Sequence, residues 1–121
     1  MISCIIKNIQ KCLIRSLLIF DNMKFKTLIE NIEKRPRGYL KNESLSEFSS
    51  LLLGFSLSDH EQDEEEIRFF QDFNMFVNSY YSLNNANYSW PYVLLLNTGG
   101  NEITALKNFF TIYHEFANKN T

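Results

Sequence analysis

The stretch DHEQDEEEIRFFQDFNMFVNSYY, residues 59–81, joins a run of charges to a run of aromatic and aliphatic residues. Its apolar positions recur at spacings that place them along one side of an α-helix. Carboxylates in the first turn of such a helix are favoured by its unpaired N–H groups and its dipole. The stretch therefore predicts a long helix with a broad aromatic face. The members of that face are Ile67, Phe69, Phe70, Phe73, Phe76, Val77, Tyr80 and Tyr81.

A shorter helix is predicted at residues 25–34. Its apolar side chains fall at spacings of three, one and three residues, which places them on one helical face. The helix closes at Arg35-Pro36, because the residue before a proline avoids the α-helical region. The members of its apolar face are Phe25, Leu28, Ile29 and Ile32.

A second helix is predicted from Ser44 to about Ser58. Ser44 is a good N-cap residue, and Glu47, three residues later, completes a capping box. The segment also carries Leu53 and Leu57 outside its main stripe, which predicts burial on more than one side. The main stripe consists of Leu45, Phe48, Leu51, Leu52 and Phe55.

The C-terminal part is predicted to hold a loop and two more helices. Residues 83–88 are rich in Asn and should form the loop. The apolar run from Trp90 to Leu96 is typical of a short buried strand or a short buried helix, and we favour a helix with Pro91 at its first position. Gly99-Gly100 stops it, and Asn101 caps a last helix. The stripe of that last helix is Ile103, Leu106, Phe109, Phe110, Tyr113 and Phe116.

These patterns predict one all-α domain of about five helices. A chain of 121 residues suits a single domain with a real hydrophobic core. Hydrophobic residues make up 45% of it and aromatic residues 15%, which is a globular composition. The four Gly and two Pro are too few for a sandwich or barrel of many short strands.

Residues 1–22 form a basic, apolar leader ahead of the helical domain predicted at residues 23–121. The longest apolar run of the leader is far shorter than the roughly 20 residues that a membrane span needs, so no stable membrane insertion is predicted. The leader also lacks the small-residue cleavage site of a secretory signal. Three interpretations remain: an extra helix of the domain, an interfacial amphipathic helix, or upstream sequence included by an early start codon. We expect a chain that begins at Met23 to keep its melting temperature within a few degrees.

The charges divide unevenly, with a net charge of +2 in residues 1–22 and of −4 in residues 23–121. Nucleic-acid binding usually needs a large cluster of Lys and Arg, and the small group around Lys34 and Arg35 predicts no nucleic-acid partner. Cys4 and Cys12 are the only cysteines, and both lie in the leader. We therefore expect a reducing, cytoplasmic environment.

No catalytic residue, metal ligand or cofactor site is predicted. A metal site needs several ligands at a workable spacing, and His60 and His114 cluster neither with each other nor with the cysteines. The chain has no Gly-x-Ser-x-Gly elbow and no Gly-rich phosphate loop. We therefore expect a binding protein rather than an enzyme.

The strongest electrostatic feature is the acidic run at residues 59–66, with six carboxylates in eight positions. Such a run creates a negative potential that can steer a basic partner. The alternative is a solvated loop and helix start. Aromatic residues on loops are common interface anchors, and Tyr88 is a candidate of this kind. The predicted binding residues are Asp59, Glu61, Asp63, Glu64, Glu65, Glu66 and Tyr88.

Several motifs together resemble a group of small α-helical immunity proteins. The segment IEKRPRGYL, residues 32–40, precedes the helix start Ser44-Leu45, an apolar helix that ends near Gly54-Phe55, and later Trp90-Pro91. Over about residues 23–116 the chain thus resembles immunity proteins found beside contact-dependent growth inhibition and related polymorphic toxin genes in bacteria. The sequence departs from the group's pattern at Gly38, where Met is usual, and at Phe55, where Tyr is frequent. The closing-helix residues that fit are Ala105, Phe109, Phe110, Glu115 and Phe116.

The resemblance implies an all-helical domain that binds the C-terminal domain of one cognate toxin in the cytoplasm. It assigns Arg35, Pro36 and Tyr39 to the fold, because immunity proteins diverge where they meet their toxin. The identity of the toxin and the oligomeric state stay open. Two other functions remain as alternatives: a membrane-associated role through the leader, and an unrecognised small enzyme.

A nuclease toxin would present a positive cleft to phosphates, and the carboxylates of residues 59–66 could occupy that cleft in their place. Replacing Asp63, Glu64, Glu65 and Glu66 together by Asn or Gln is then expected to slow association. We expect this replacement to leave the fold intact, because charges at the rim of an interface act mainly on the association rate.

Overall fold

The computed structural model describes residues 23–83 and 85–119, and within these ranges all regular structure is helical. The all-α prediction is confirmed, with five α-helices and one short 3-10 helix in the described residues. The leader, residues 1–22, lies outside them. The helices are α3 (Phe25–Lys34), η2 (Pro36–Gly38), α4 (Leu45–Leu57), α5 (Glu64–Tyr80), α6 (Trp90–Asn97) and α7 (Glu102–Lys119).

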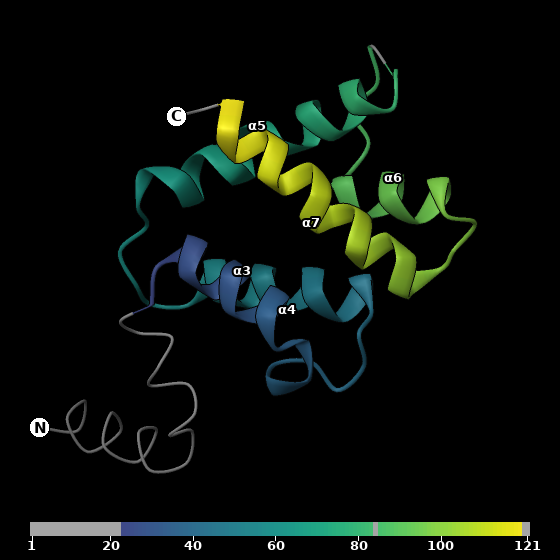
Figure 1. The fold of residues 1–121 in the computed structure, drawn as a ribbon. Coiled ribbons are helices and arrows are strands. Elements are labelled where there is room, and N and C mark those ends of the chain that lie inside the picture. Colours follow the sequence, from purple (N-terminus) through teal and green to yellow (C-terminus); the bar gives the residue numbers. More distant parts are fainter. Residues whose placement is uncertain (1–22, 84, 120–121) are drawn as a thin grey trace, which may run out of the picture.

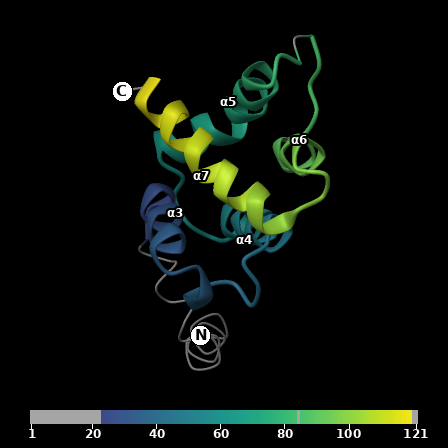
Figure 2. The ribbon, with the colours of Figure 1, turned by 45° about the vertical axis from the view of Figure 1, so that its right-hand side comes forward.

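The last helix, α7, organises the packing. It runs diagonally across the middle of the molecule and contacts α4, α5 and α6 (Figure 1). The turned view of Figure 2 shows α6 beside the first half of α7 and α3 at the opposite edge of the molecule. Helices as short as α3 and α6 are marginal alone, so the burial of their apolar sides holds them in place.

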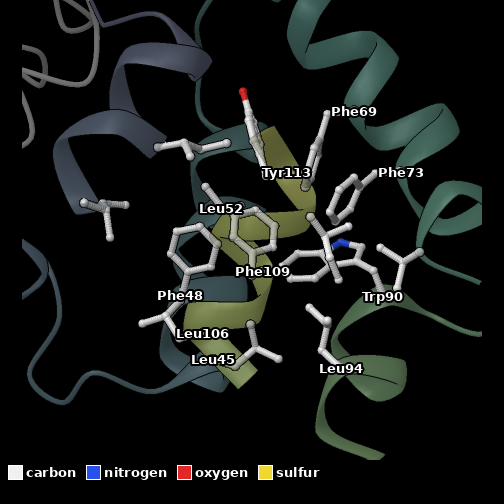
Figure 3. Close-up of a cluster of buried hydrophobic side chains, with 14 of the residues drawn as sticks. Leu45, Phe48, Leu52, Phe69, Phe73, Trp90, Leu94, Leu106, Phe109 and Tyr113 are labelled. Atoms are coloured by element: carbon white, nitrogen blue, oxygen red, sulfur yellow. The ribbon is translucent and has the colours of Figure 1, made fainter. Parts of the chain in front are cut away.

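Aromatic rings from four helices meet at Phe109 of α7 (Figure 3). The centroid of its ring lies 4.6 Å from that of Phe48 on α4, 5.4 Å from that of Phe73 on α5 and 5.0 Å from that of Trp90 on α6. Such tilted and edge-on ring contacts add to the stabilisation that burial provides. The segment that could have been a buried strand or a buried helix is a helix, and its first residue, Trp90, enters the core.

The ends of the helices follow the local sequence signals closely. The Ser44 hydroxyl accepts the N–H of Glu47 at 3.1 Å, as the capping box predicts. The Glu47 carboxylate, however, accepts the N–H of Asn42 at 2.7 Å in place of the N–H of the N-cap residue. Asn101 caps α7 by accepting the N–H of Thr104 at 3.0 Å.

The residues that the helices bury differ from the predicted apolar stripes at several positions. Leu53 and Leu57 are 55% and 78% exposed, so the prediction that α4 is buried on more than one side was wrong. The reason is that α4 packs against α6 and α7 on one side, and nothing in the described chain covers its outer side. Ile103 is also exposed. Pro91 is the second residue of α6, because the helix already begins at Trp90.

The aromatic face of α5 is narrower than predicted. Phe69, Phe73 and Val77 are fully buried. Other predicted members lie at the edge of the core, and of these Ile67 and Phe70 are 41% and 38% exposed. The remaining members are half-buried or exposed: Phe76, Tyr80 and Tyr81.

Candidate functional site

The acidic run occupies the connection between α4 and α5 and the first turn of α5. We call residues 59–66 the acidic segment. It begins directly after Ser58, the C-cap residue of α4, and it contains Asp63, the N-cap residue of α5. The segment therefore links two helix ends and is fixed at both of them.

Each helix end is closed by a side chain. The Ser58 hydroxyl donates a hydrogen bond of 2.6 Å to the carbonyl of Phe55 at the end of α4. The Asp63 carboxylate accepts the N–H of Glu66 at 2.9 Å at the start of α5. These bonds satisfy backbone groups that a helix end otherwise leaves unpaired.

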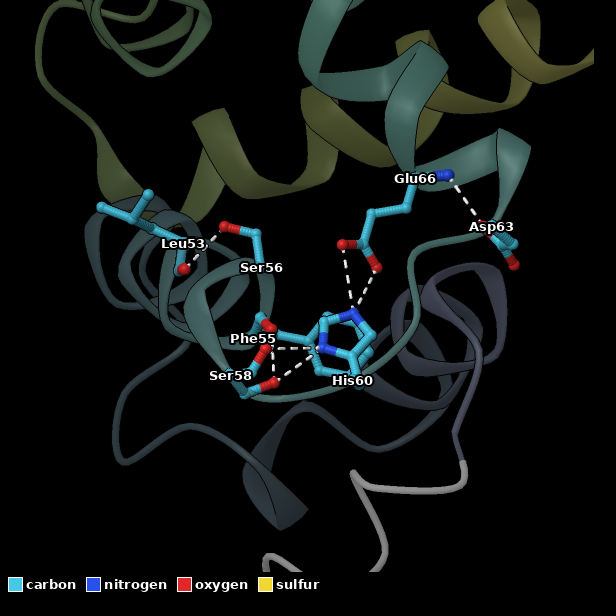
Figure 4. Close-up of polar contacts among 7 residues, drawn as sticks. All are labelled: Leu53, Phe55, Ser56, Ser58, His60, Asp63 and Glu66. Atoms are coloured by element: carbon cyan, nitrogen blue, oxygen red, sulfur yellow. Dashed lines mark hydrogen bonds and ion pairs between the residues drawn. The ribbon is translucent and has the colours of Figure 1, made fainter.

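A buried ion pair spans the segment between these two caps (Figure 4). His60 Nε2 lies 2.8 Å from Glu66 Oε1 and 3.1 Å from Glu66 Oε2. The side chains of His60 and Glu66 are only 6% and 1% exposed. The imidazole also packs on the ring of Phe55, with 4.4 Å between the ring centroids. His60 thus ties the first turn of α5 to the end of α4.

The hydrogen bonds around His60 favour one protonation state of its ring. Nε2 faces a carboxylate, which only accepts, so this nitrogen carries a proton. Nδ1 lies 2.8 Å from the Ser58 hydroxyl oxygen and 3.2 Å from the Ser58 carbonyl oxygen. The Ser58 carbonyl only accepts, and the Ser58 hydroxyl can accept from Nδ1 while it donates to the Phe55 carbonyl. The arrangement is therefore fully satisfied when the imidazole carries both protons.

The charges near His60 support this state. The hydrogen bond to the Glu66 carboxylate raises the pKa of His60 above its usual value of 6.5. Burial of the ring opposes this shift, and the negative charges of Glu66 and Asp63 and the Ser58 carbonyl reinforce it. The pair is thus an ion pair across a larger part of the neutral range than an ordinary histidine would allow.

Ser58, His60 and Glu66 line up in the order of a serine hydrolase triad, but the surrounding carbonyl groups favour hydrogen bonds in the opposite direction. In such a triad the imidazole accepts the proton of the serine hydroxyl. Here the Phe55 carbonyl lies 2.6 Å from the Ser58 hydroxyl as a competing acceptor, and the Ser58 carbonyl 3.2 Å from Nδ1 favours a proton on that nitrogen. The three residues are therefore arranged to brace two helix ends.

The other carboxylates of the acidic segment point to solvent. Asp59, Glu61, Glu64 and Glu65 are exposed, and Asp63 is half-buried at its capping position. A hollow of about 290 Å³ lies beside the segment, between it and the start of α3. Lys24, His60 and Glu61 are among the residues that line the hollow. The segment therefore presents four carboxylates on a backbone that the two helix caps and the His60–Glu66 pair hold in place.

No family model, curated protein or solved structure matches this chain. None of the helices in the described ranges is long and apolar enough to cross a bilayer. Within residues 23–83 and 85–119 no three His, Cys, Asp or Glu side chains are grouped so that they could hold a metal ion.

Two members of the predicted site lie apart from the four exposed carboxylates. Glu66 is buried and bonded to His60, because side chains in the first turn of a helix point back towards its N-terminus. It therefore cannot face a partner. Tyr88 is exposed, but it is bonded to Asn78, twelve residues after Glu66 on α5. That separation is about 18 Å along the helix axis, so Tyr88 does not belong to the acidic segment.

Partly exposed apolar residues that do lie near the acidic segment are Ile67 and Phe70. They follow it directly, in the first turns of α5. The ring of Phe70 also packs on Phe25, with 5.6 Å between the centroids. The sequence pattern assigned both residues to the core. The His60–Glu66 pair had only a weak signal in the sequence, namely a histidine that lies between the end of one helix and an Asp-x-x-Glu start of the next.

Proposed function

We propose that this chain is an immunity protein that binds a cognate toxin and blocks it sterically and electrostatically. The observation that supports the proposal best is the set of four exposed carboxylates on the braced acidic segment. A rigid negative surface suits a partner with a positive cleft, such as a nuclease, because little ordering is needed on binding. The motifs shared with the immunity proteins of contact-dependent inhibition systems support the same function.

Within this proposal the binding surface has two parts. Asp59, Glu61, Glu64 and Glu65 supply the long-range attraction that speeds association. Ile67 and Phe70 supply apolar contact area next to them, as the buried centre of an interface requires. Asp63 and Glu66 hold the backbone in shape and make no contact with the toxin.

The decisive experiment uses the toxin domain encoded next to this gene. Co-expression of the chain with the C-terminal domain of the neighbouring large secreted protein should restore growth, and the two purified domains should bind. Growth arrest in the presence of the chain, together with no binding, would contradict the proposal.

The contribution of charge to toxin binding is tested with a variant that keeps the His60–Glu66 pair and the helix caps. Replacing Asp59 by Asn and Glu61, Glu64 and Glu65 by Gln should slow association at low salt about tenfold or more and flatten its salt dependence. The matched control removes the same number of charges outside the segment, with Asp72 replaced by Asn and Glu30, Glu43 and Glu115 by Gln. Neutralising residues 63–66 together is a less specific test, because Glu66→Gln also removes the charge that faces His60 in the buried pair.

A further inference from the structure

The Ser58 hydroxyl lies within hydrogen-bond distance of two possible acceptors. Its oxygen is 2.6 Å from the Phe55 carbonyl oxygen and 2.8 Å from His60 Nδ1 (Figure 4). A hydroxyl has one proton and donates it to one of these acceptors at a time. The acceptor that receives the proton therefore depends on whether Nδ1 itself carries a proton.

When the imidazole is charged, both of its nitrogens are donors. Nε2–H then donates to the Glu66 carboxylate at 2.8 Å, and Nδ1–H faces the Ser58 carbonyl oxygen at 3.2 Å. The Ser58 hydroxyl has Phe55 as its acceptor, so it holds the carbonyl at the end of α4. In this state each of these donors has an acceptor.

Loss of one proton from the imidazole reverses the direction at Nδ1. Nε2 faces a carboxylate and keeps its proton, so the proton leaves from Nδ1. The lone pair of Nδ1 then faces the Ser58 carbonyl oxygen, and two acceptors at 3.2 Å repel each other. The Ser58 hydroxyl is the donor that lies next to Nδ1. When it turns to Nδ1, the Phe55 carbonyl loses its bond from the hydroxyl.

Burial makes this change of protonation act on the backbone. The side chains of His60 and Glu66 are almost completely buried, so solvent contributes little to either charge state. The contact between Nε2 and Glu66 persists in both states, and the start of α5 therefore stays in place. Ser58 is exposed, and its carbonyl also accepts the backbone N–H of His60 at 2.9 Å. The turn at residues 58–60 is thus the part that rearranges.

The charged groups that face His60 come from three parts of the chain. Glu66 and Asp63 belong to the start of α5, Glu61 lies in the acidic segment, and Lys24 precedes α3 across the hollow. The α4 side contributes an aromatic ring and no charge. The hydrogen bond to Glu66 raises the pKa of His60 above 6.5, and burial opposes this shift. The two states therefore exchange above the usual pH for histidine.

We propose that His60 is a pH-sensitive switch that controls the end of α4 through the hydroxyl of Ser58. The charged imidazole leaves the hydroxyl on the Phe55 carbonyl, and the neutral imidazole draws it to Nδ1. At lower pH the end of α4 is held, and at higher pH the turn at residues 58–60 loosens. This inference concerns the chain alone and does not depend on the toxin-binding proposal.

An NMR titration of the full 121-residue chain from about pH 5.5 to about pH 9 tests the switch. The ¹⁵N resonance of His60 Nδ1 should change to that of an unprotonated nitrogen, while Nε2 stays protonated. With the same midpoint, the protection of the Ser58 amide against hydrogen exchange should fall at least about threefold. The Glu66 amide should keep its protection. Loss of the proton from Nε2, or constant protection at Ser58 while His60 titrates, overturns the proposal.

Variants test whether the two events are coupled. Glu66→Gln removes the main cause of the raised pKa, so the midpoints of His60 and of the Ser58 amide should move down together by at least about half a pH unit. Glu65→Gln, at the exposed neighbour, should leave both midpoints where they are. Midpoints that separate in Glu66→Gln would show that His60 does not control the turn.

A second variant tests the hydroxyl and keeps the ion pair. Ser58→Ala lacks the hydroxyl in both charge states, so the amide of residue 58 should show the lower protection already at pH 6. His114→Gln, which removes the other histidine, should leave the transition at Ser58 unchanged. A Ser58→Ala chain that keeps the full threefold fall across the midpoint would show that the hydroxyl is not the part that moves.

Discussion

The two ends of α5 are fixed by opposite chemistry. At its start the buried His60–Glu66 ion pair joins α5 to the end of α4. At its other end the neutral side chains of Asn74 and Asn78 bind the backbone that leads into α6. A buried ion pair depends on pH and fails when either partner loses its charge, whereas an amide keeps its donors and acceptors at every ordinary pH. The contacts at the two ends of α5 therefore respond differently when a charge is added or removed.

The largest effect should come from adding a charge at the neutral end. Asn78→Asp keeps the size of the side chain but removes the amide donors, so the carboxylate faces the carbonyls of Asn74 and Tyr88. Because the site is only 2% exposed, we expect a loss of about 3–4 kcal/mol in the free energy of unfolding at neutral pH. Urea unfolding followed by circular dichroism measures it.

The pH dependence of that variant supplies its check. Burial raises the pKa of the new carboxyl, so the penalty is present above its unfolded pKa of about 4 and falls as the acid form becomes populated. The deficit relative to the unmodified chain should therefore shrink towards pH 4. Asn87→Asp, which adds the same charge at an exposed position of the same loop, should leave the stability unchanged. Equal effects at the two positions would show that Asn78 does not clamp the loop.

Removing a charge at the other end should have a smaller effect. Glu66→Gln keeps the shape of the side chain and one acceptor but leaves the imidazolium without a counterion. We expect a loss of about 2 kcal/mol at pH 6, in the range of a hydrogen bond between charged groups. The exposed neighbour Glu65 serves as the control, because Glu65→Gln should leave the unfolding midpoint where it is. A stable Glu66→Gln protein would mean that the pair contributes little to the brace.

The third effect in size is a change with pH in the free energy of unfolding. The pKa of His60 is raised in the folded state, so its contribution is fully present below the unfolded value of 6.5 and is lost as pH rises through the folded value. The difference in unfolding free energy between the unmodified chain and Glu66→Gln should therefore decrease from pH 6 to pH 9. Urea titrations at several pH values, with an NMR titration of the His60 ring, test this. A difference that stays constant with pH would rule out the charged pair.

The smallest effect is expected at the other histidine. His114 Nε2 lies 2.9 Å from Glu33 Oε1, but these side chains are 52% and 38% exposed. Solvent screens such a pair, so His114→Gln should change the stability by no more than about 0.5 kcal/mol. If it matches Glu66→Gln in size, burial is not what distinguishes the two pairs.

The sequence predicts the helices well and the surface poorly, for a physical reason. Helix starts depend on local groups, and Ser44 and Asn101 cap their helices as their sequence context indicates. The side of a helix that is buried depends on its neighbours, and periodicity alone cannot show that Leu57 and Ile103 lie outside the packed arcs. Residues that are far apart in the sequence but meet in space have no local signal at all.

The candidate site shows the same limit. Composition identifies the acidic segment, because six carboxylates in eight residues are visible in any window. It cannot separate Glu66 from Glu65, which are adjacent and chemically alike but face the core and the solvent. Only the position of His60 six residues earlier distinguishes them. The placement of Tyr88 at the far end of α5 likewise follows from a hydrogen bond over ten residues.

Ser58 and the acidic segment contain two kinds of residue, those that fix the backbone and those that reach solvent, and the difference affects how such a protein can evolve. Ser58, His60, Asp63 and Glu66 fix the backbone, while the positions between them reach solvent. Substitutions at residues 59, 61, 64 and 65 can therefore alter or reverse the surface charge without refolding the segment. Under the proposed function, a lineage of such proteins could change its toxin specificity at these positions by single mutations that cost little stability.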